Sequence, residues 1–422
     1  MNITEVTNYL EELAPLHYAE DFDNVGLLVG NPETIVTGVL VTLDTLEETV
    51  NEAIAKKCNL IISFHPIIFS GLKKITGRSY VERVVLKAIQ NNIAIYATHT
   101  ALDNSKNGVS AKMCEVLGLE NTQILIPKKG IIKKLTTFVP MQNAAALRAT
   151  LFAAGAGNIG NYDQCSFSAE GTGTFRGNES SNPVIGEKGK THTESETQIS
   201  VVLESKNETS ILNALKKQHP YEEVAYDIMT TENVHQDIGM GMVGELPKEM
   251  DAKEFLLFLK KTMQTDCVRH SELLHKKIKK VAVLGGAGSF AIADAKRAGA
   301  DAYVSADFKY HEFFKAEKNI LLADIGHYES EQFTKTLLVD YLKKKISNFA
   351  VVLSEKSTIY INFDTRIDDY GELDQTSTQI RRTGYFAENY TGGDEVEVTV
   401  IDNYEYEEVN WKLAVEWRYA LN

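Results

Sequence analysis

The sequence predicts an α/β protein with a parallel-rich sheet core built from two halves and a ferredoxin-like α+β domain inserted between them. Strand-like and helix-like stretches alternate in residues 1–127 and again in 241–363. Such alternation is typical of parallel sheets joined by right-handed crossovers. The segment 128–240 has a different order of elements, so we predict that it forms a separate domain. The remainder, 364–422, is predicted to be an acidic C-terminal β extension.

The first half contains three stretches in which apolar residues run almost continuously, as in strands that are covered on both faces. The expected order along the chain is the strand GVLVTLD (38–44), a helix at about 45–57, the strand NLIISF (59–64), a helix near 79–91 and the strand IAIYATH (93–99).

The second half repeats this pattern from about residue 280. We expect, in order, the strand KVAVLGG, a helix through AIADAKRAGA, the strands DAYVSAD (301–307) and NILLADIG (319–326), and one long amphipathic helix from about 328 to 345. Apolar residues at helical spacing support that last helix. The two stretches look like halves of one sheet-based domain.

The inserted segment is predicted to follow the ferredoxin-like order of strands and helices. KLTTFVP is expected to be a strand, followed by a helix in NAAALRATLFAAG, two strands in YDQCSFSA and GTGTFRG, the strand QISVVLE, a helix capped by Asn207 and the strand EVAYDIM.

The tail shows period-two alternation at 394–402 and at 409–417, which predicts a hairpin. Trp411 and Trp417 would lie on the same face of its second strand. Residues 364–422 carry 14 Asp and Glu against 5 Lys and Arg, so much of the formal charge of −14 sits here. A negative chain is a poor partner for nucleic acid, and we expect none.

Cysteine spacing and hydropathy indicate the compartment. Cys58, Cys114, Cys165 and Cys267 lie far apart with no CxxC pair, which fits a reducing cytoplasm. The acidic first residues and the lack of any stretch near 18 consecutive apolar residues predict neither a signal peptide nor a membrane span.

Histidines stand where three of the expected strands end. His65 follows NLIISF, His99 closes IAIYATH and is followed on a loop by Asp103, and His327 follows NILLADIG with Glu331 one helical turn further on. The carboxyl ends of parallel strands are where open α/β sheets bind ligands. Each histidine alone is more simply a strand cap, but together they favour a metal site.

The predicted metal ligands are therefore His65, Asp103, His327 and Glu331, and His99 is left as a catalytic acid or base. Two imidazoles and two carboxylates match Zn, Mn or Fe(II) better than Ca or Mg, because nitrogen ligands favour the first group.

Three further motifs allow two interpretations each. GGAGS (285–289) could bind an anion with its backbone N–H groups, but a tight turn explains it at least as well, and a dinucleotide site is weakly indicated. Asp307, Tyr310 and His311 could orient ligands or line a substrate pocket, or they could belong to an ordinary surface helix. Asp23 and Asn24 could contact substrate, although Asx residues before glycine commonly form turns.

Several of these segments together resemble the Nif-three-like family of dinuclear-metal proteins, the GTP cyclohydrolase 1 type 2 homologs. The matching segments are DFDNVGLLVG, LIISFHPIIF, THTALDN, VAVLGGAG, VSADFKYHE and ADIGHYESE, with AAGAGNIGNYDQCSFSAEGTGTFRG and HPYEEVAYDI in the insert.

The resemblance implies a homohexamer, a trimer of dimers, with two divalent ions per subunit and Glu331 as the bridge between them. It also implies that the inserted domain is like the trimer-forming modules of signal-transduction and copper-tolerance proteins. Phe64 departs from the family pattern, because a histidine that binds a metal usually stands there. The second ion is therefore expected to be held more weakly.

The implied function is that of a divalent-metal-dependent hydrolase that acts on a nucleotide or phosphoester through a metal-bound hydroxide. The alternative is a non-catalytic metal-binding ring scaffold whose inserted domain senses a small molecule. Turnover assays with Zn, Mn and Fe(II) separate the two.

Overall fold

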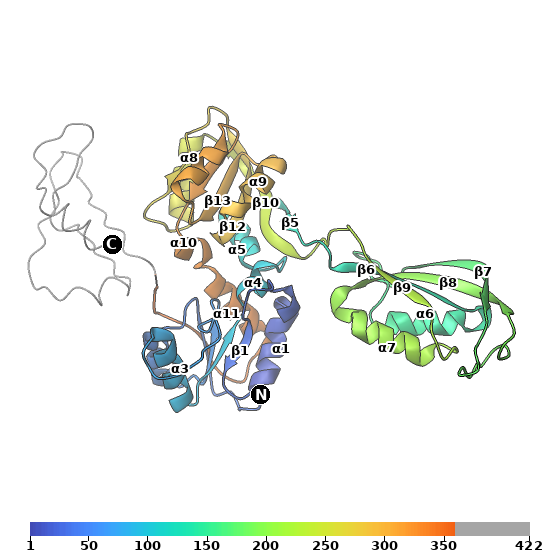
Figure 1. Cartoon of the computed structure of the whole chain (residues 1–422). Coiled ribbons are helices and arrows are strands. Elements are labelled where there is room, and N and C mark those ends of the chain that lie inside the picture. The colour runs from blue at the N-terminus through green and yellow to red at the C-terminus, as the bar shows by residue number, and fades with distance from the viewer. Residues whose placement is uncertain (359–422) are drawn as a thin grey trace, which may run out of the picture. The chain divides into compact units, whose positions relative to one another are not determined.

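A computed structural model describes residues 1–358. Their strands form three sheets of five, six and four strands (Figure 1). Two sheets carry helices on both faces and mix parallel with antiparallel strands, and the third is antiparallel throughout. The α/β class is therefore confirmed.

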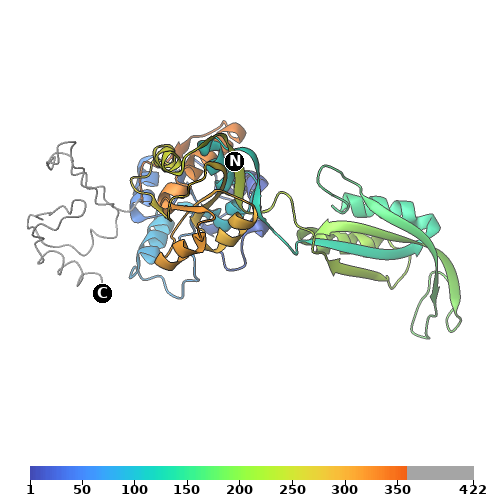
Figure 2. The same ribbon diagram turned by 90° about the horizontal axis from the view of Figure 1, so that it is seen from above.

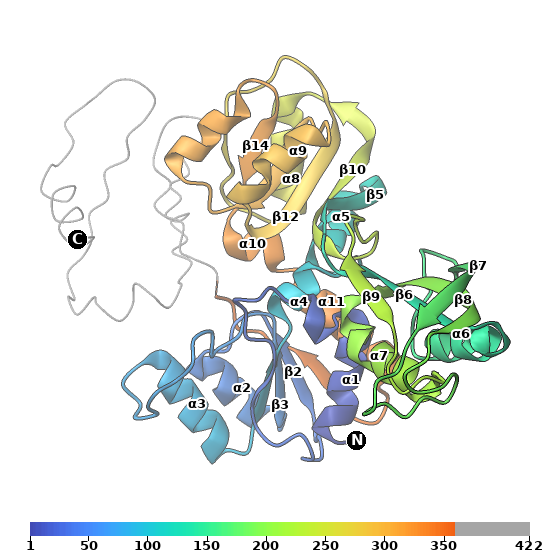
Figure 3. The same ribbon diagram turned by 45° about the vertical axis from the view of Figure 1, so that its right-hand side comes forward.

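The first sheet has the order β1-β4-β3-β2-β15. Helices α1 and α11 pack on one face and α2 and α3 on the other, with β2 and β3 between them (Figure 3). Asn2 and Glu5 form a capping box that starts α1, and Ser79 caps α3. The elements are β1 (Gly26–Val29), β4 (Ala94–Ala97), β3 (Leu60–Ser63), β2 (Val39–Thr42), β15 (Val351–Leu353), α1 (Ile3–Leu13), α2 (Glu47–Ala55), α3 (Tyr80–Gln90) and α11 (Thr334–Lys345).

The second sheet has the order β11-β14-β13-β12-β10-β5. Helices α5 and α8 cover one face and α9 covers the other. The elements are β11 (Arg269–His270), β14 (Leu321–Asp324), β13 (Ala302–Ala306), β12 (Ile278–Ala287), β10 (Gly239–Met250), β5 (Glu120–Pro127), α5 (Val109–Leu117), α8 (Ala252–Thr262) and α9 (Ile292–Arg297).

The two halves do not share one sheet, which corrects the simplest reading of the sequence. Instead, each half contributes to the sheet of the other. Strand β15 pairs in parallel with β2 of the first half, and β5 pairs with β10 of the second. Leu338 and Leu342 of α11 also pack in the core of the first sheet. The alternating pattern identified the strands but could not assign them to sheets, because pairing depends on contacts far apart in sequence.

The inserted segment forms its own sheet in the order β7-β8-β6-β9, and its elements follow the ferredoxin-like order β6-α6-β7-β8-α7-β9. Helices α6 and α7 pack on one face against a separate apolar cluster. The elements are β6 (Ile132–Pro140), α6 (Ala144–Ala153), β7 (Ser166–Phe175), β8 (His192–Glu204), α7 (Glu208–Gln218) and β9 (Tyr226–Thr230).

Three local expectations were wrong. The two strands predicted around the GTG sequence are one strand, because Gly171 and Gly173 stay in the ladder opposite Glu196 and Glu194. Asn207 precedes α7 but its side chain makes no capping hydrogen bond, since its backbone is already helical.

The long helix expected at 328–345 is the third. It is two helices, α10 (His327–Glu331) and α11. They are interrupted at Gln332, whose side-chain amide donates a hydrogen bond to the carbonyl of Met263.

The predicted domain boundaries at residues 127, 240 and 363 stay predictions. The boundary at residue 240 falls inside strand β10. The tail at 364–422, with its expected hairpin and two tryptophans, lies outside the described residues. Within residues 1–358, no helix is both long enough and apolar enough to cross a membrane.

The two segments that connect the inserted domain to the core run side by side (Figure 2). Pro127 pairs with Gly239 across β5 and β10, and the amide of Lys128 donates to the carbonyl of Ile238 at 2.8 Å. The core strands therefore approach each other at the point where the insert leaves and returns.

Replacing residues 129–237 with a short glycine-containing hairpin loop should leave a folded core, because β5 and β10 would then form an ordinary hairpin. Circular dichroism and metal content of the shortened chain test this expectation. Insoluble or unfolded protein, next to a well-behaved full-length chain, would contradict the independence of the core.

Candidate metal centre

The predicted site residues stand at the ends of strands from two different sheets. His65 follows β3, and His99 begins the short helix α4 (His99–Asp103) directly after β4. His327 begins α10 shortly after β14 of the second sheet. The segment from His99 to Asp103 was expected to be a loop and is instead one helical turn.

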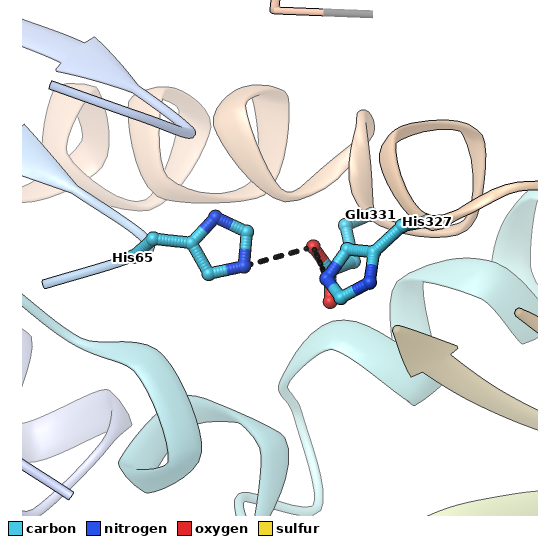
Figure 4. A group of neighbouring side chains, drawn as sticks. All are labelled: His65, His327 and Glu331. Atoms are coloured by element: carbon cyan, nitrogen blue, oxygen red, sulfur yellow. Dashed lines mark ion pairs between the residues drawn. The ribbon is translucent and has the colours of Figure 1, made fainter. Parts of the chain in front are cut away.

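His65, His327 and Glu331 form one compact group (Figure 4). One ligand atom of each lies within 4.8 Å of the others. Oε2 of Glu331 is 3.2 Å from Nε2 of His65 and 3.3 Å from Nε2 of His327. The side chain of Glu331 is buried. The fold thus joins three of the four predicted ligands across 262 residues of sequence.

Asp103, the fourth predicted ligand, lies at the end of α4 and is not a member of this group. Burial and the negative charge of Glu331 both raise the pKa of its carboxyl well above the usual range. Asp103 therefore lies within the electrostatic field of the site, and its role as a ligand stays a prediction.

The outer nitrogen of each histidine contacts a carboxylate. Nδ1 of His65 is 2.9 Å from Oδ1 of Asp44, and Nδ1 of His327 is 2.7 Å from Oδ2 of Asp307. A carboxylate at Nδ1 holds the proton there and leaves Nε2 with its lone pair when the ring is neutral. Both rings are thus oriented with Nε2 toward Glu331, as metal-binding histidines require.

The charges of the group depend on one another. Burial opposes the positive charge on His65, but Asp44 and Glu331 outweigh it and raise the pKa of the imidazole to about 10. The same balance, with Asp307 and Glu331, raises the pKa of His327 to about 11. Burial alone would raise the pKa of Glu331, yet the two histidines lower it to about 2. The carboxylate therefore stays ionised in a buried place.

His99 lies beside the group, with its ring centroid 5.4 Å from that of His65. Its Nδ1 is 2.8 Å from Oδ1 of Asp23, whose other oxygen accepts a hydrogen bond from the amide of Thr100 at 3.0 Å. Burial would raise the pKa of Asp23, but the hydrogen bonds from His99 and Thr100 hold it at about 2. The contact with Asp23 thus fixes the orientation of the His99 ring.

Comparison with known proteins places the chain in a family. The family model described as Duf34/NIF3 (NGG1p interacting factor 3) matches residues 1–359. The chain belongs to this family. Residues 360–422 lie outside the match.

Two relatives illustrate the similarity within the NIF3 family. A GTP cyclohydrolase 1 type 2 homolog of Bacillus subtilis (strain 168) is 40% identical over 330 residues, which cover 78% of this chain and 88% of that protein. A protein of the same name from Staphylococcus epidermidis is 34% identical over 362 residues, covering 85% and 98%.

Solved structures of NIF3-like proteins share the fold. A Bacillus cereus protein related to NIF3 matches with a TM-score of 0.69 at 36% identity, over 86% of this chain and 99% of that one. Staphylococcus aureus protein SA1388 matches with a TM-score of 0.71 at 30% identity, over the same shares of the two chains.

The three grouped residues fit a divalent metal ion. Oε2 of Glu331 is buried and makes no hydrogen bond to any residue that the structure describes, although two imidazole nitrogens flank it. Its charge is balanced by these two imidazoles and not by a hydrogen bond. Two Nε2 lone pairs and a carboxylate oxygen form a donor set that a transition-metal ion would satisfy.

Gly286, which lies in the GGAGS segment near the end of β12, makes room for these ligands. Gly286 has a left-handed φ of +69°, and a Cβ at this position would overlap Oε1 of Glu331 and lie 3.3 Å from Nε2 of His327. The hydroxyl of Ser330 accepts a hydrogen bond from the amide of Gly286 at 2.8 Å. The end of β12 therefore packs against the candidate metal site, where the sequence had suggested a tight turn.

Sequence reasoning missed one part of the site and left two open. Asp44 was not singled out, although it closes the strand expected at 38–44 and so stands at the same sheet edge as His65. Asp307 orients His327, as one of its two interpretations proposed. Asn24 donates to the carbonyl of Ile68 at 2.5 Å, which gives it a loop-fixing role. Tyr310 and His311 contact one another edge to face, with ring centroids 5.0 Å apart, on an exposed 3-10 helix.

Gly286→Ala should lower metal content, because the new methyl group displaces Glu331 and His327. Gly299→Ala is the matched control: Gly299 has φ +71°, but nothing lies within 4 Å of a Cβ there. Both changes carry the left-handed backbone cost of roughly 1–2 kcal/mol. Thermal unfolding should therefore shift in both variants, whereas metal retained after gel filtration should fall only in Gly286→Ala. Equal metal content in the two variants would contradict this role of Gly286.

Proposed function

We propose that this NIF3-family chain is a divalent-metal-dependent hydrolase that acts on a nucleotide or another phosphoester. The observation that carries the proposal is the buried oxygen of Glu331, flanked by Nε2 of His65 and of His327. Zn, Fe and Mn are the ions that such a donor set favours. The names of the relatives, GTP cyclohydrolase 1 type 2 homologs, support a nucleotide as the substrate class.

A divalent ion, when bound, supplies an acidified water molecule and polarises a phosphoryl or carbonyl oxygen. The chain supplies the positioning: His65, His327 and Glu331 hold the ion, and Asp103 is proposed as a further ligand. Asp44 and Asp307 keep the two imidazole rings turned toward the ion.

His99 is proposed to move the proton. Its Nδ1 is held by Asp23, which leaves Nε2 to take a proton from the attacking group or to give one to the leaving group. The ring lies beside His65, so proton transfer would occur next to the ion.

We further propose a second, more weakly held ion and a homohexameric assembly, a trimer of dimers, both on the family resemblance. Phe64 is fully buried, and its ring centroid lies 4.9 Å from that of His65 and 5.7 Å from that of His99. A phenyl ring offers no lone pair at the position where the family pattern has a histidine. In such a two-ion site, His65, Asp103 and Glu331 would hold the first ion, and the second would rest on His327 and Glu331.

Two variants separate metal binding from proton transfer. Glu331→Gln should lose both metal and turnover, whereas His99→Asn should keep its metal and lose about 10²- to 10⁴-fold in kcat. The assay offers GTP, other nucleotides and phosphoesters to protein loaded with Zn, Mn or Fe(II). Metal-loaded wild-type protein that turns over none of them would favour the alternative, a metal-binding ring scaffold. An unchanged kcat in His99→Asn would remove His99 from the chemistry.

Phe64→His should raise the amount of metal that survives mild chelation, because it adds a nitrogen donor beside the site. Phe64→Leu is the matched control, since it keeps the position apolar and should give no gain. In the natural protein one ion should leave before the other. Two equally retained ions in the natural protein, or equal retention in the two variants, would show that Phe64 does not stand in for a ligand.

A further inference from the structure

The inserted domain contains a cavity of about 630 Å³. It lies on the sheet face opposite α6 and α7. Ile199 and Val201 of β8 point into the apolar core beneath those helices, so Glu196 and Gln198, which line the cavity, point to the other face. The loop after β7 and the segment that follows α7 complete the walls. A cavity of this size suits a small ligand.

Glu196 lies at the centre of the polar part of this cavity. The residue is 9% exposed, and its Oε1 accepts a hydrogen bond from the hydroxyl of Tyr221 at 2.8 Å. A Cβ on Gly173 would overlap the other oxygen, so the absence of a side chain at Gly173 is what makes room for the carboxylate.

Phe175 and Tyr221 line the same cavity as this carboxylate. The ring centroid of Phe175 lies 5.4 Å from that of Tyr221 and 5.3 Å from that of His192. The ring centroid of His219 lies 5.1 Å from that of Tyr221. Nε2 of His219 is 2.8 Å from the carbonyl oxygen of Phe138. The rings are therefore held in place before any ligand arrives.

The charges of the lining select among ligand classes. Four glutamates line the cavity against a single basic side chain, Arg176, so a phosphate or another anion would be repelled. In the described part of the chain, the only group of side chains with metal-ligand spacing is the one at His65, so a bare metal ion is also disfavoured here. An organic cation could pair with the carboxylate and pack against the aromatic rings. The acidic residues are Glu170, Glu196, Glu222 and Glu223.

We propose that this cavity binds a small organic ammonium ion with an apolar part, with Glu196 as its counter-ion and Phe175 and Tyr221 as the ring faces against which it packs. Such a site is separate from the metal centre and does not depend on the proposed hydrolase activity. It gives the inserted domain a ligand class of its own.

Calorimetric titration of the full chain with choline and with 3,3-dimethyl-1-butanol tests the charge, because the two probes have nearly the same shape and only choline is cationic. Phenethylamine and 2-phenylethanol form a second such pair, in which the cation is a primary amine. In each pair the cation should bind at least about tenfold more tightly, which corresponds to roughly 1.4 kcal/mol. A neutral probe that binds as tightly as its cation, or no binding of either cation, would overturn the proposal.

Glu196→Gln removes the charge and keeps an oxygen for Tyr221, so it should weaken binding of the cations about tenfold or more. Glu232→Gln, an exposed position in the same domain, is the matched control and should bind as the wild type does. Phe175→Leu keeps an apolar side chain but removes a ring, and it should also weaken binding of choline. Circular dichroism checks that each variant is folded. Unchanged affinity in a folded Glu196→Gln chain would overturn the assignment of the counter-ion.

Discussion

The contact between Glu331 and two histidines is the constraint on which the candidate site depends. A buried carboxylate is stable only if cations or hydrogen bonds surround it. Here His65 comes from the first sheet and His327 from the second, so the carboxylate is satisfied only while the two sheets keep their mutual position. A metal ion in the same place would replace the attraction between charges with coordination, and it would link the same elements.

The exchange of strands between the halves explains how that position is kept. Because β15 returns to the first sheet and β5 joins the second, the chain crosses between the two sheets in both directions. Helix α11 adds apolar contacts with the first sheet directly after the helix that carries His327 and Glu331. The rigid scaffold thus lies immediately behind the ligands, where a preorganised metal site needs it.

Part of the fold and of the site could be predicted from the sequence, because the patterns that indicate this part are local. Apolar runs marked the strands, and histidines at strand ends marked the edge where ligands gather. Asp44 was missed because a lone aspartate after a strand has no spacing that distinguishes it from a turn residue. The role of Gly286 and the assignment of strands to sheets depend on close approaches between segments far apart in sequence, and no local pattern records these. The family resemblance supplied what periodicity could not.

Crystallography with anomalous scattering at the absorption edges of Zn, Fe and Mn tests the central claim most directly. The account predicts an anomalous peak at about 2.0–2.2 Å from Nε2 of His65 or His327 and from a carboxylate oxygen of Glu331. Crystals of protein purified with added metal that show no peak beside these atoms, with Glu331 still paired only with the two imidazoles, would contradict it.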